Sequence, residues 1–420
     1  MTSEKGEPKY ETAFVWVWLP GALEPVAAGR LDQDRDVVVF TYGRRYLAHE
    51  HAISLFLPEL PLDSGPQLPV VGVVAGCIRD AAPDGWGERV IENRLVGRNG
   101  ALTGDQQHGL LTYLLESGSN RIGALDFQLS PTEYVAREPT NATIATVAEL
   151  MESADRVDAG IPLSPELDLA LFHGTSIGGA RPKATLVDNG RHLIAKFSSQ
   201  SDTAPLVQFE FLGMELARRC GLNVAPVKLV EVNKRQVLMI ERFDRSIDGS
   251  RRAMVSALTI LGLDENGGRY ASYADLADQI RARFANPNAT LKEVFARMVF
   301  NINIGNTDDH ARNHAGFWNG HELALTPAYD LSPWLRSGGE TSQSMIIDRD
   351  GHRDSRLVRC LEAANIFHVD PLEARSIIDD QIAVVEAEWD DVCEAAQLKP
   401  VDRKRLRNSA VLHPSTKYGY

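Results

Sequence analysis

Asn306–Asp330 reads NTDDHARNHAGFWNGHELALTPAYD and combines acids, asparagines and histidines in one short span. The segment before it, residues 290–304 (TLKEVFARMVFNINI), has apolar residues at helical spacing, which predicts a helix. Gly305-Asn306 should end this helix, so we expect Asp308 to lie on the loop that follows.

Asp308 and Asn313 are five residues apart, which is the D-x-x-x-x-N interval of a kinase catalytic loop. In that chemistry the aspartate accepts the proton of a substrate hydroxyl, and the asparagine binds magnesium. Asp330 follows an expected strand at residues 322–326, in the place of a second magnesium ligand. The spacing therefore favours Asp308 as a catalytic base, with Asn313 and Asp330 as metal ligands.

Two other interpretations of this stretch are open. Surface loops are often rich in Asp, Asn and His without any catalytic role. A zinc site would use His310 and His314 as H-x-x-x-H, but the metalloprotease motif requires Glu directly after the first histidine, where this chain has Ala311. We therefore disfavour zinc and expect the two histidines to cap or orient the loop.

The composition points to a cytoplasmic protein. The chain has 420 residues, enough for several domains, and a formal net charge of −13, so bare nucleic acid should repel it. Its four cysteines are far apart and form no C-x-x-C pair, which fits a reducing compartment. The polar start MTSEKGEPKYE lacks the apolar core of a signal peptide, and the longest apolar run, residues 70–78, is too short to cross a bilayer. We expect no membrane contact, and contact with DNA mainly through a partner.

The first part of the chain, residues 13–130, reads as a small α/β domain. Aromatic and β-branched residues predict strands at 14–19 and 37–42, and Asp84 or Gly85 should begin a helix with a tryptophan against its start. This part holds no evident catalytic constellation, so a structural or partner-binding domain is the favoured interpretation. The segment after it, 131–165, should form a linker and an amphipathic helix.

Residues 166–245 contain a loop of small residues at Ser176–Gly179. An Asp-Asn-Gly turn at 188–190 should join two strands into a hairpin, and the second strand carries Lys196. A glycine loop lets backbone N–H groups approach phosphate oxygens, and a nearby lysine adds positive charge. The loop matches neither G-x-G-x-x-G nor the Walker pattern, so an ordinary hairpin with a glycine-rich entry is the alternative.

The order of these parts is typical of protein-kinase-like folds: loop, lysine-bearing strand, helix, second hairpin, then D-x-x-x-x-N and a later Asp. The helix should be Leu206–Cys220, and its Glu210 is a candidate partner for Lys196; a solvated glutamate on a helix face is the alternative. Glu241–Phe243 falls where the hinge between kinase lobes should lie. We predict an α+β, protein-kinase-like two-lobe fold with an N-terminal α/β extension domain and a mainly helical C-terminal lobe.

The helical catalytic lobe should occupy residues 246–400, and Ser272 and Asp275 form an S-x-x-D capping box in it. Residues 401–420 should be a basic tail. Such a cluster is usually a solvated surface, and contact with nucleic acid or a partner is the alternative. Its basic residues are Arg403, Lys404, Arg405 and Arg407.

Several segments resemble those of one known family. SIGGARPKA, MIERFDR, TDDHARN and AYDLSP, in this order along the chain, resemble motifs of the HipA-like serine/threonine kinases, the toxins of bacterial toxin–antitoxin pairs. APDGWGERVIENRL and GALDF resemble segments of that family's N-terminal domain. The likeness covers roughly residues 13–390.

The resemblance implies transfer of the γ-phosphate of ATP, with magnesium (Mg2+), to a serine or threonine of a protein. It implies that Lys196 is the strand lysine, Asp308 the catalytic base, and Asn313 and Asp330 the metal ligands. It also implies that Ser176 is phosphorylated by the enzyme itself, which switches the kinase off. The residues implied to lie against the nucleotide are Ile177, Gly178, Gly179, Ala180, Arg181, Pro182 and Lys183 of the loop, Glu241, Arg242 and Phe243 of the hinge, and His310, Ala311, Arg312 and Asn313.

The resemblance also implies partners. The usual partner in the family is a small HipB-like helix-turn-helix antitoxin that binds operator DNA, and known protein targets include aminoacyl-tRNA synthetases. Two departures from ordinary protein kinases fit the family: Thr307 precedes Asp308, so H-R-D is missing, and Leu331 follows Asp330, so D-F-G is missing. Asp309 stands where the family often has glycine, and Asp308 is preferred as the base because only it is five residues from the asparagine.

Two other classes of function stay open. One is a small-molecule kinase of the aminoglycoside-phosphotransferase type, which has a similar order of loops. The other is an inactive corepressor that only assists an antitoxin on DNA. The intact set of Lys196, Asp308, Asn313 and Asp330 argues against the corepressor, because an inactive protein has no need of it.

Overall fold

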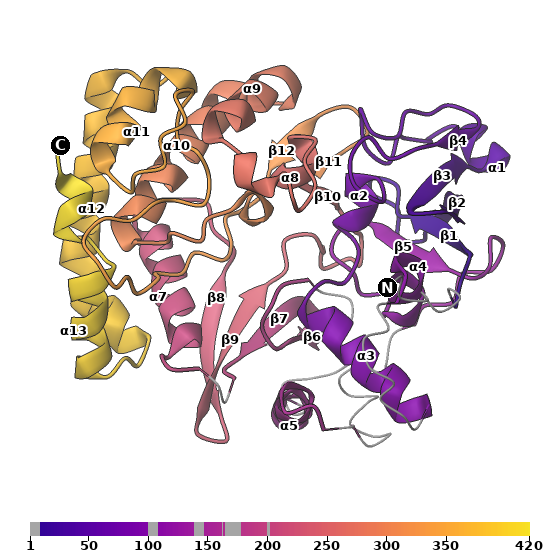
Figure 1. The fold of residues 1–420 in the computed structure, drawn as a ribbon, viewed down its shortest axis with the longest axis horizontal. Coiled ribbons are helices and arrows are strands. Elements are labelled where there is room, and N and C mark those ends of the chain that lie inside the picture. Colours follow the sequence, from indigo (N-terminus) through magenta and orange to yellow (C-terminus); the bar gives the residue numbers. More distant parts are fainter. Residues whose placement is uncertain (1–8, 100–107, 138–146, 162, 164–177, 200–201) are drawn as a thin grey trace, which may run out of the picture. The chain divides into compact units, whose positions relative to one another are not determined.

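The computed structural model describes residues 9–99, 108–137, 147–161, 163, 178–199 and 202–420 (Figure 1). The chain divides into two compact units. Among the described residues, no helix is both long enough and apolar enough to span a membrane. Unit 1 contains residues 1–201, 231–254 and 318–320, and unit 2 contains residues 202–230, 255–317 and 321–420.

Unit 1 contains an antiparallel sheet in which the strands follow the order β4 (Pro66–Gln67), β3 (Val37–Tyr42), β2 (Val26–Asp34), β1 (Thr12–Val17) and β5 (Leu125–Gln128) (Figure 1). The strand predicted at 37–42 is confirmed as β3, and the one predicted at 14–19 overlaps β1. The sequence of β2, VAAGRLDQD, has few β-branched or aromatic residues and does not by itself predict a strand. Pairing with β1 on one side and β3 on the other decides its conformation.

Helices accompany this sheet in the described part of unit 1. The helix predicted to begin at Asp84 or Gly85 is confirmed, since it starts at Trp86, and Trp86 is fully buried. The amphipathic helix predicted within 131–165 is also confirmed, and its apolar face is buried. The helices are α1 (Arg44–Leu47), α2 (Gly76–Arg79), α3 (Trp86–Asn99), α4 (Leu110–Glu116) and α5 (Val147–Asp158).

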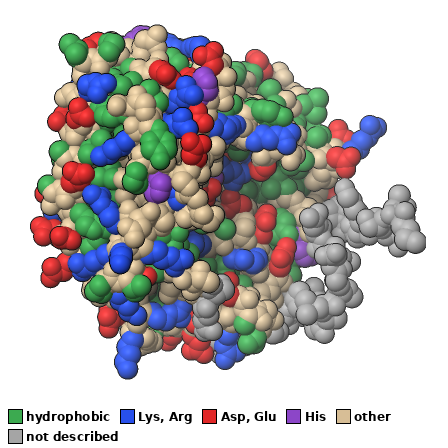
Figure 2. Space-filling model, turned by 60° about the vertical axis from the view of Figure 1, so that its left-hand side comes forward, with side chains coloured by type: hydrophobic (Ala, Val, Ile, Leu, Met, Phe, Trp, Pro, Cys, Tyr) green, Lys and Arg blue, Asp and Glu red, His purple; other side chains and the backbone are tan. Residues whose placement is uncertain are grey.

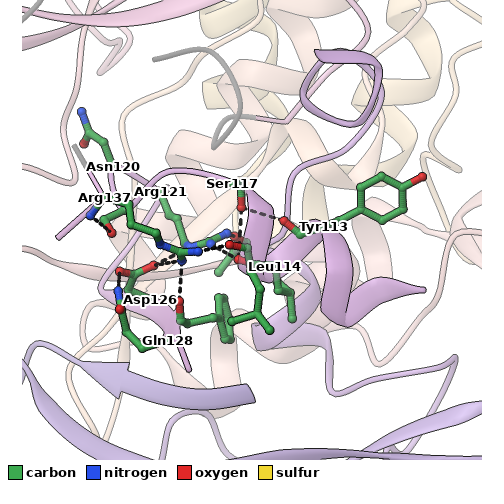
Figure 3. Close-up of polar contacts among 12 residues, drawn as sticks. Tyr113, Leu114, Ser117, Asn120, Arg121, Asp126, Gln128 and Arg137 are labelled. Carbon is green, nitrogen blue, oxygen red and sulfur yellow. Dashed lines mark hydrogen bonds and ion pairs between the residues drawn. The ribbon is translucent and has the colours of Figure 1, made fainter. Parts of the chain in front are cut away.

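A buried ion pair holds the loop between α4 and β5 (Figure 3). Nε of Arg121 donates to Oδ1 of Asp126 at 2.8 Å, and both side chains are 0% exposed. The same guanidinium donates to the carbonyl oxygens of Leu114 and, at 3.3 Å, of Ala81. Burial lowers the pKa of Arg121 to about 10, although Asp126 opposes the shift. Arg121 therefore ties α4, β5 and the segment before α3 together.

A second sheet contains the predicted hairpins, in the order β6 (Lys183–Asp188), β7 (Arg191–Phe197), β9 (Arg235–Glu241) and β8 (Val227–Val232). The Asp-Asn-Gly turn between β6 and β7 is confirmed. Asn189 and Gly190 both have positive φ, +48° and +78°, as a two-residue hairpin turn of type I′ requires. The chain passes from unit 2 to unit 1 within β8, after Val230.

Unit 2 is mainly helical, as predicted. Every residue of α10 (Pro287–Ile304) from Met298 to Ile304 is buried, so this end of the helix is surrounded by protein. The predicted capping box is confirmed, because Oγ of Ser272 accepts the N–H of Asp275 at 2.9 Å. A small sheet has the order β10 (Ala253–Ser256), β11 (Ala315–Trp318), β12 (Leu323–Leu325). The other helices are α7 (Leu206–Arg219), α8 (Ala257–Ile260), α9 (Tyr273–Arg283), α11 (Leu357–Ala363), α12 (Pro371–Ala395) and α13 (Pro400–Ser409), with 3-10 turns at Gly268–Tyr270, Ala311–Asn313, Ala364–Phe367 and Pro414–Lys417.

Residues 401–420 form a packed segment of unit 2 rather than a free tail. Val411 and Thr416 are fully buried, and the N–H of Leu412 donates to the carbonyl oxygen of Asn303 in α10 at 2.7 Å. The basic side chains of α13 stay nearer the surface. On this side of the molecule Lys and Arg side chains are interspersed with Asp and Glu (Figure 2). Contact of the basic cluster with nucleic acid stays a prediction.

Candidate active site

The loop with Asp308 begins where α10 ends, as predicted. Gly305 closes the helix in the left-handed conformation, with φ +71°, and the N–H of Asn306 returns to the carbonyl oxygen of Asn301 at 2.8 Å. A Cβ at position 305 would lie 2.7 Å from the carbonyl oxygen of Ala410. The end of α10 and the C-terminal segment thus set the point at which the loop leaves the core.

Asp309 anchors this loop from the inside. Its side chain is 1% exposed and accepts a hydrogen bond from the hydroxyl of Tyr273. Nε2 of His314 lies 2.9 Å from its other carboxylate oxygen. Burial, and then the Asp309 carboxylate, raise the pKa of Tyr273 well above its ordinary value, so this hydroxyl stays a donor. His314 thus orients the loop, as predicted.

Asp308 has the opposite environment, because the residue is exposed. The pKa of its carboxyl is nevertheless raised, first by partial desolvation and then by the neighbouring carboxylates of Asp330 and Asp309, while His310 opposes the shift. A general base works best when its pKa lies closer to the operating pH than that of an ordinary aspartate. Of the two adjacent acids, Asp308 is the exposed one, and this environment fits its predicted role as the base.

The two predicted metal ligands lie near Asp308 in unit 2. Nδ2 of Asn313 donates to the carbonyl oxygen of Asp308 at 3.3 Å, which turns the amide oxygen of Asn313 away from that carbonyl. Asp330 has a left-handed backbone with φ +59°, and the Tyr329 hydroxyl before it donates to the carbonyl oxygen of Arg312 at 2.7 Å. Amide and carboxylate oxygens are the donors that Mg²⁺ prefers, and a cation would relieve the repulsion that raises the Asp308 pKa. The donor set therefore fits magnesium.

The other residues predicted beside the nucleotide in unit 2 differ in exposure. Ala311 is buried within the 3-10 turn, and His310 is partly exposed before it. The guanidinium of Arg312 donates to the carboxylate of Glu265. Glu210 is buried on α7, and its predicted pairing with Lys196 stays a prediction.

In unit 1, the predicted phosphate loop leads into β6. Ser176 and Ile177 lie outside the described residues. Gly179 has φ +102°, and Nζ of Lys183 donates to the carbonyl oxygen of Gly178 at 2.7 Å. Ala180, Arg181 and Pro182 complete the described part of the loop.

Lys183 and Lys196 stand directly opposite each other on β6 and β7. Directly opposite residues of an antiparallel pair project from the same face of a sheet, and like charges in that position are unfavourable. An anion beside this face would reduce the repulsion. The predicted phosphate-binding role of Lys196 fits this arrangement.

The predicted hinge, Glu241–Phe243, is tied to the N-terminal part of unit 1. The backbone N–H of Arg242 donates to the carbonyl oxygen of His192 at 2.9 Å. Its buried guanidinium donates to Asp244, at 2.7 and 2.9 Å, and to the carbonyl oxygens of Asn120 and Arg121. The predicted contact of Arg242 with adenine is therefore restricted to its backbone carbonyl, because the side chain and the N–H are used inside unit 1.

Sequence patterns assign no role in the site to residues 82–95 or 119–123, yet both segments contact its parts. Asp244 accepts the N–H of Gly123 at 2.7 Å, and Arg245 donates to the carbonyl oxygen of Gly123 at 2.8 Å. The start of α3 contacts the glycine loop. The family motifs APDGWGERVIENRL and GALDF mark these segments in the sequence, but only the folded chain shows which residues they contact.

One further group of possible metal ligands in the described chain is Asp348, Asp350 and His352. The Asp348 carboxylate accepts the N–H groups of Asp350 and His352 at 3.0 and 3.1 Å, and its other oxygen lies 2.7 Å from Nδ1 of His352. The three residues therefore lie together because the Asp348 carboxylate closes the loop at residues 348–352 through these bonds.

Family comparisons agree with the geometry. The HipA-like C-terminal domain matches residues 175–389, more than half of the chain, and the HipA N-terminal domain matches residues 17–128. The chain belongs to the HipA family. The first match contains the glycine loop, the hinge, Asp308 and Asp330, and the second contains the start of α3 and the Asn120–Gly123 segment.

Individual proteins are similar to parts of this chain. The serine/threonine-protein kinase toxin HipA of Shewanella oneidensis is 30% identical over 184 residues, which are 37% of this chain and 42% of that protein. Toxin YjjJ of Escherichia coli is 26% identical over 177 residues, 39% of each chain. The matched segments thus span about two fifths of these relatives.

A solved structure extends the likeness over the whole fold. The HipA chain in a complex of Shewanella oneidensis HipA, HipB and operator DNA matches with a TM-score of 0.66 at 20% identity, covering 93% of this chain and 94% of that one. At this identity the match concerns the fold. It confirms the predicted fold class.

Proposed function

We propose that the chain is an ATP-dependent serine/threonine protein kinase and the toxin of a toxin–antitoxin pair. The observation that carries the proposal is the division of labour between two adjacent acids: Asp309 is buried and anchors the loop, and Asp308 is exposed with a raised pKa. An exposed base beside two oxygen ligands for magnesium suits proton removal from a hydroxyl during phosphate transfer. The names of the relatives, a kinase toxin and a toxin, support the proposed role.

In the proposed reaction Asp308 accepts the proton of a substrate hydroxyl. The hydroxyl oxygen bonds to the γ-phosphorus of ATP, the bond from that phosphorus to the β,γ-bridging oxygen breaks, and ADP leaves. Lys196 and backbone N–H groups of the glycine loop other than that of Gly179, which donates to Asp84, hold the phosphates. Backbone groups of Glu241 and Phe243 meet the adenine. Asn313 and Asp330 would hold magnesium, which when bound neutralises charge on the phosphate oxygens.

The proposed partner is a HipB-like helix-turn-helix antitoxin, through which the chain would reach operator DNA. The support is the solved relative, whose structure contains HipB and operator DNA. The proposed substrate is a protein, of which an aminoacyl-tRNA synthetase is one candidate. Self-phosphorylation of Ser176 belongs to the same proposal and rests on the family resemblance.

Phosphoproteomics after brief expression in a bacterial host tests the kinase proposal. We expect new phosphoserine or phosphothreonine sites with the wild type and none with Asp308→Asn at equal protein level. Co-expression of the antitoxin should restore growth. Mass spectrometry of the purified chain after incubation with ATP tests Ser176, which should carry phosphate in the wild type and none in Asp308→Asn.

Two results would replace the proposal with one of its alternatives. ATP consumption without any new protein phosphosite, but with a phosphorylated metabolite, would indicate a small-molecule kinase. No ATP consumption, together with tighter operator binding by the antitoxin, would indicate a corepressor.

A further inference from the structure

The start of α3 is bonded to the glycine loop through both polar groups of one peptide residue. The N–H of Gly179 donates to Oδ1 of Asp84, and the carbonyl oxygen of Gly179 accepts the N–H of Trp86 at 2.9 Å. Asp84 and Gly179 are 95 positions apart in the chain. The N–H belongs to the peptide unit before Gly179 and the carbonyl to the unit after it, so neither of these peptide planes can rotate without breaking one of the two bonds.

Two side chains of α3 extend the contact along the loop. Nε1 of Trp86 donates to the carbonyl oxygen of Lys183 at 3.0 Å, and the tryptophan is fully buried. Nη2 of Arg89 donates to the carbonyl oxygen of Ala180 at 2.7 Å, and its guanidinium lies over the Trp86 ring. The described part of the loop is therefore bonded to α3 at Gly179, Ala180 and Lys183.

Glycines on both sides allow this close approach. A Cβ at Gly178 would lie 2.8 Å from Oδ1 of Asp84, and a Cβ at Gly85 would lie 3.2 Å from the carbonyl oxygen of Gly179. Gly85 also has positive φ, +40°. The contact thus depends on both the PDGW segment and the two glycines of the loop.

The start of α3 is itself held in place. The carbonyl oxygen of Ala81 accepts a bond from the buried guanidinium of Arg121, which pairs with Asp126 (Figure 3). Arg89 also lies 3.8 Å from Asp158 of α5. The glycine loop is therefore bonded to an ordered part of unit 1.

A glycine-rich loop loses much backbone entropy when it is ordered, so it needs bonds that hold it open for phosphate oxygens. We infer that Asp84, Trp86 and Arg89 are positioning residues that hold the glycine loop ready for the nucleotide, so that the N-terminal domain is part of the nucleotide-binding machinery. The inference rests on the proposed kinase function for its effect on ATP. The contact itself can be tested without that function.

Hydrogen exchange of the nucleotide-free full-length chain tests the contact. Peptides covering residues 178–186 should exchange about tenfold faster in Asp84→Ala than in the wild type, because a hydrogen bond to a charged group is lost. Asp84→Asn, which keeps an oxygen to accept the Gly179 N–H, should lie between the two. Arg89→Ala tests the same contact from an exposed position, where folding is not at risk. The matched control is Arg30→Ala, which removes a surface arginine that pairs with Asp32 in the sheet of unit 1.

Titration with magnesium and ATP tests the consequence. Asp84→Ala and Arg89→Ala should raise the KM for ATP by about tenfold with kcat changed by less than about twofold, because they act on the loop and not on the reacting atoms. Arg30→Ala should leave both constants unchanged. If Asp84 and Arg89 served only the general stability of the fold, their variants would unfold at a lower midpoint and lose kcat, without a selective rise of the KM for ATP.

Three outcomes would overturn the inference. An unchanged exchange rate of residues 178–186 in Asp84→Ala and Arg89→Ala would show that these side chains do not hold the loop. Faster exchange with unchanged ATP affinity would leave the contact without a positioning role. Tighter ATP binding by Asp84→Ala would show that the Asp84 carboxylate competes with phosphate for the loop. If the wild type transfers no phosphate but the exchange and ATP-binding changes occur, the kinase proposal fails while the positioning role stands.

Discussion

Nε2 of His314 lies 2.9 Å from the buried carboxylate of Asp309, the residue that follows Asp308 in the chain. The Tyr273 hydroxyl donates to the other oxygen of the same carboxylate, so Asp309 holds the loop through both of its oxygens. The neighbouring Asp308 is exposed. Two adjacent aspartates therefore lie in different environments, one buried and bonded and the other exposed.

Asp308→Asn should lower phosphate transfer by about 10²- to 10⁴-fold, because it removes the proposed base. Its free energy of unfolding should change by less than about 0.5 kcal/mol, since the side chain is exposed. Asp309→Asn should instead lower the free energy of unfolding by about 1–3 kcal/mol, because it disturbs buried hydrogen bonding. Phosphate transfer assays and urea unfolding measure the two effects. Full activity of Asp308→Asn would exclude it as the base.

Lys196→Ala should weaken ATP binding by about 10- to 100-fold, because the ammonium group is proposed to bind phosphate oxygens. Lys183→Ala should have a milder effect, since Nζ of Lys183 is bonded to the carbonyl oxygen of Gly178. Calorimetric titration with magnesium and ATP compares the two variants. An unaffected Lys196→Ala would show that the strand lysine is assigned to the wrong residue.

His192 should make unit 1 less stable in mild acid. Burial, and then Arg242 and Arg245, lower its pKa from 6.5 to about 4. Between these values the unfolded chain binds a proton that the folded chain does not, so the free energy of unfolding should fall as the pH drops from 6.5 to 4. Urea unfolding at several pH values in this range measures the slope.

His192→Gln should reduce this slope, whereas the exposed His51→Gln should leave it as in the wild type. Burial raises the pKa of Asp244, but pairing with Arg242 and Arg245 outweighs burial and lowers the pKa below its ordinary value of 3.8. The stability that this pairing adds is therefore lost only when the pH falls below 3.8, outside the range in which His192 acts. An identical pH slope in His192→Gln and the wild type would exclude the histidine as the cause.

Gly305→Ala should be more damaging than Gly262→Ala. The two glycines have nearly equal φ, +71° and +66°, so the backbone strain of about 1–2 kcal/mol is matched. A Cβ at 305 meets the backbone of Ala410, whereas a Cβ at 262 meets nothing within 4 Å. We expect a total loss of about 2–5 kcal/mol at 305. Phosphate transfer should also fall only in Gly305→Ala, because the loop with Asp308 begins at the next residue. Urea unfolding measures the stability of both variants. Equal losses of unfolding free energy in the two variants would show that the backbone near Ala410 moves aside without a measurable energetic cost.

Much of the fold follows from short-range sequence patterns. The Asp-Asn-Gly turn between β6 and β7, the Ser272 capping box and the end of α10 at Gly305 are confirmed in the structure. Each depends on residues within a few positions of one another, so the local sequence is sufficient to specify it. The five-residue interval from Asp308 to Asn313 is local in the same sense, and it locates the loop of the candidate site.

Tertiary structure decided the features whose partners are distant in the chain. It paired β2 with neighbours on both sides, buried Asp309 rather than Asp308, and bonded Arg242 to Asn120 and Asp84 to Gly179. The sequence shows that these residues can form hydrogen bonds, but not with which groups. The physical reason is that a buried polar group must find a partner, and only the packing of the folded chain determines which groups come within reach.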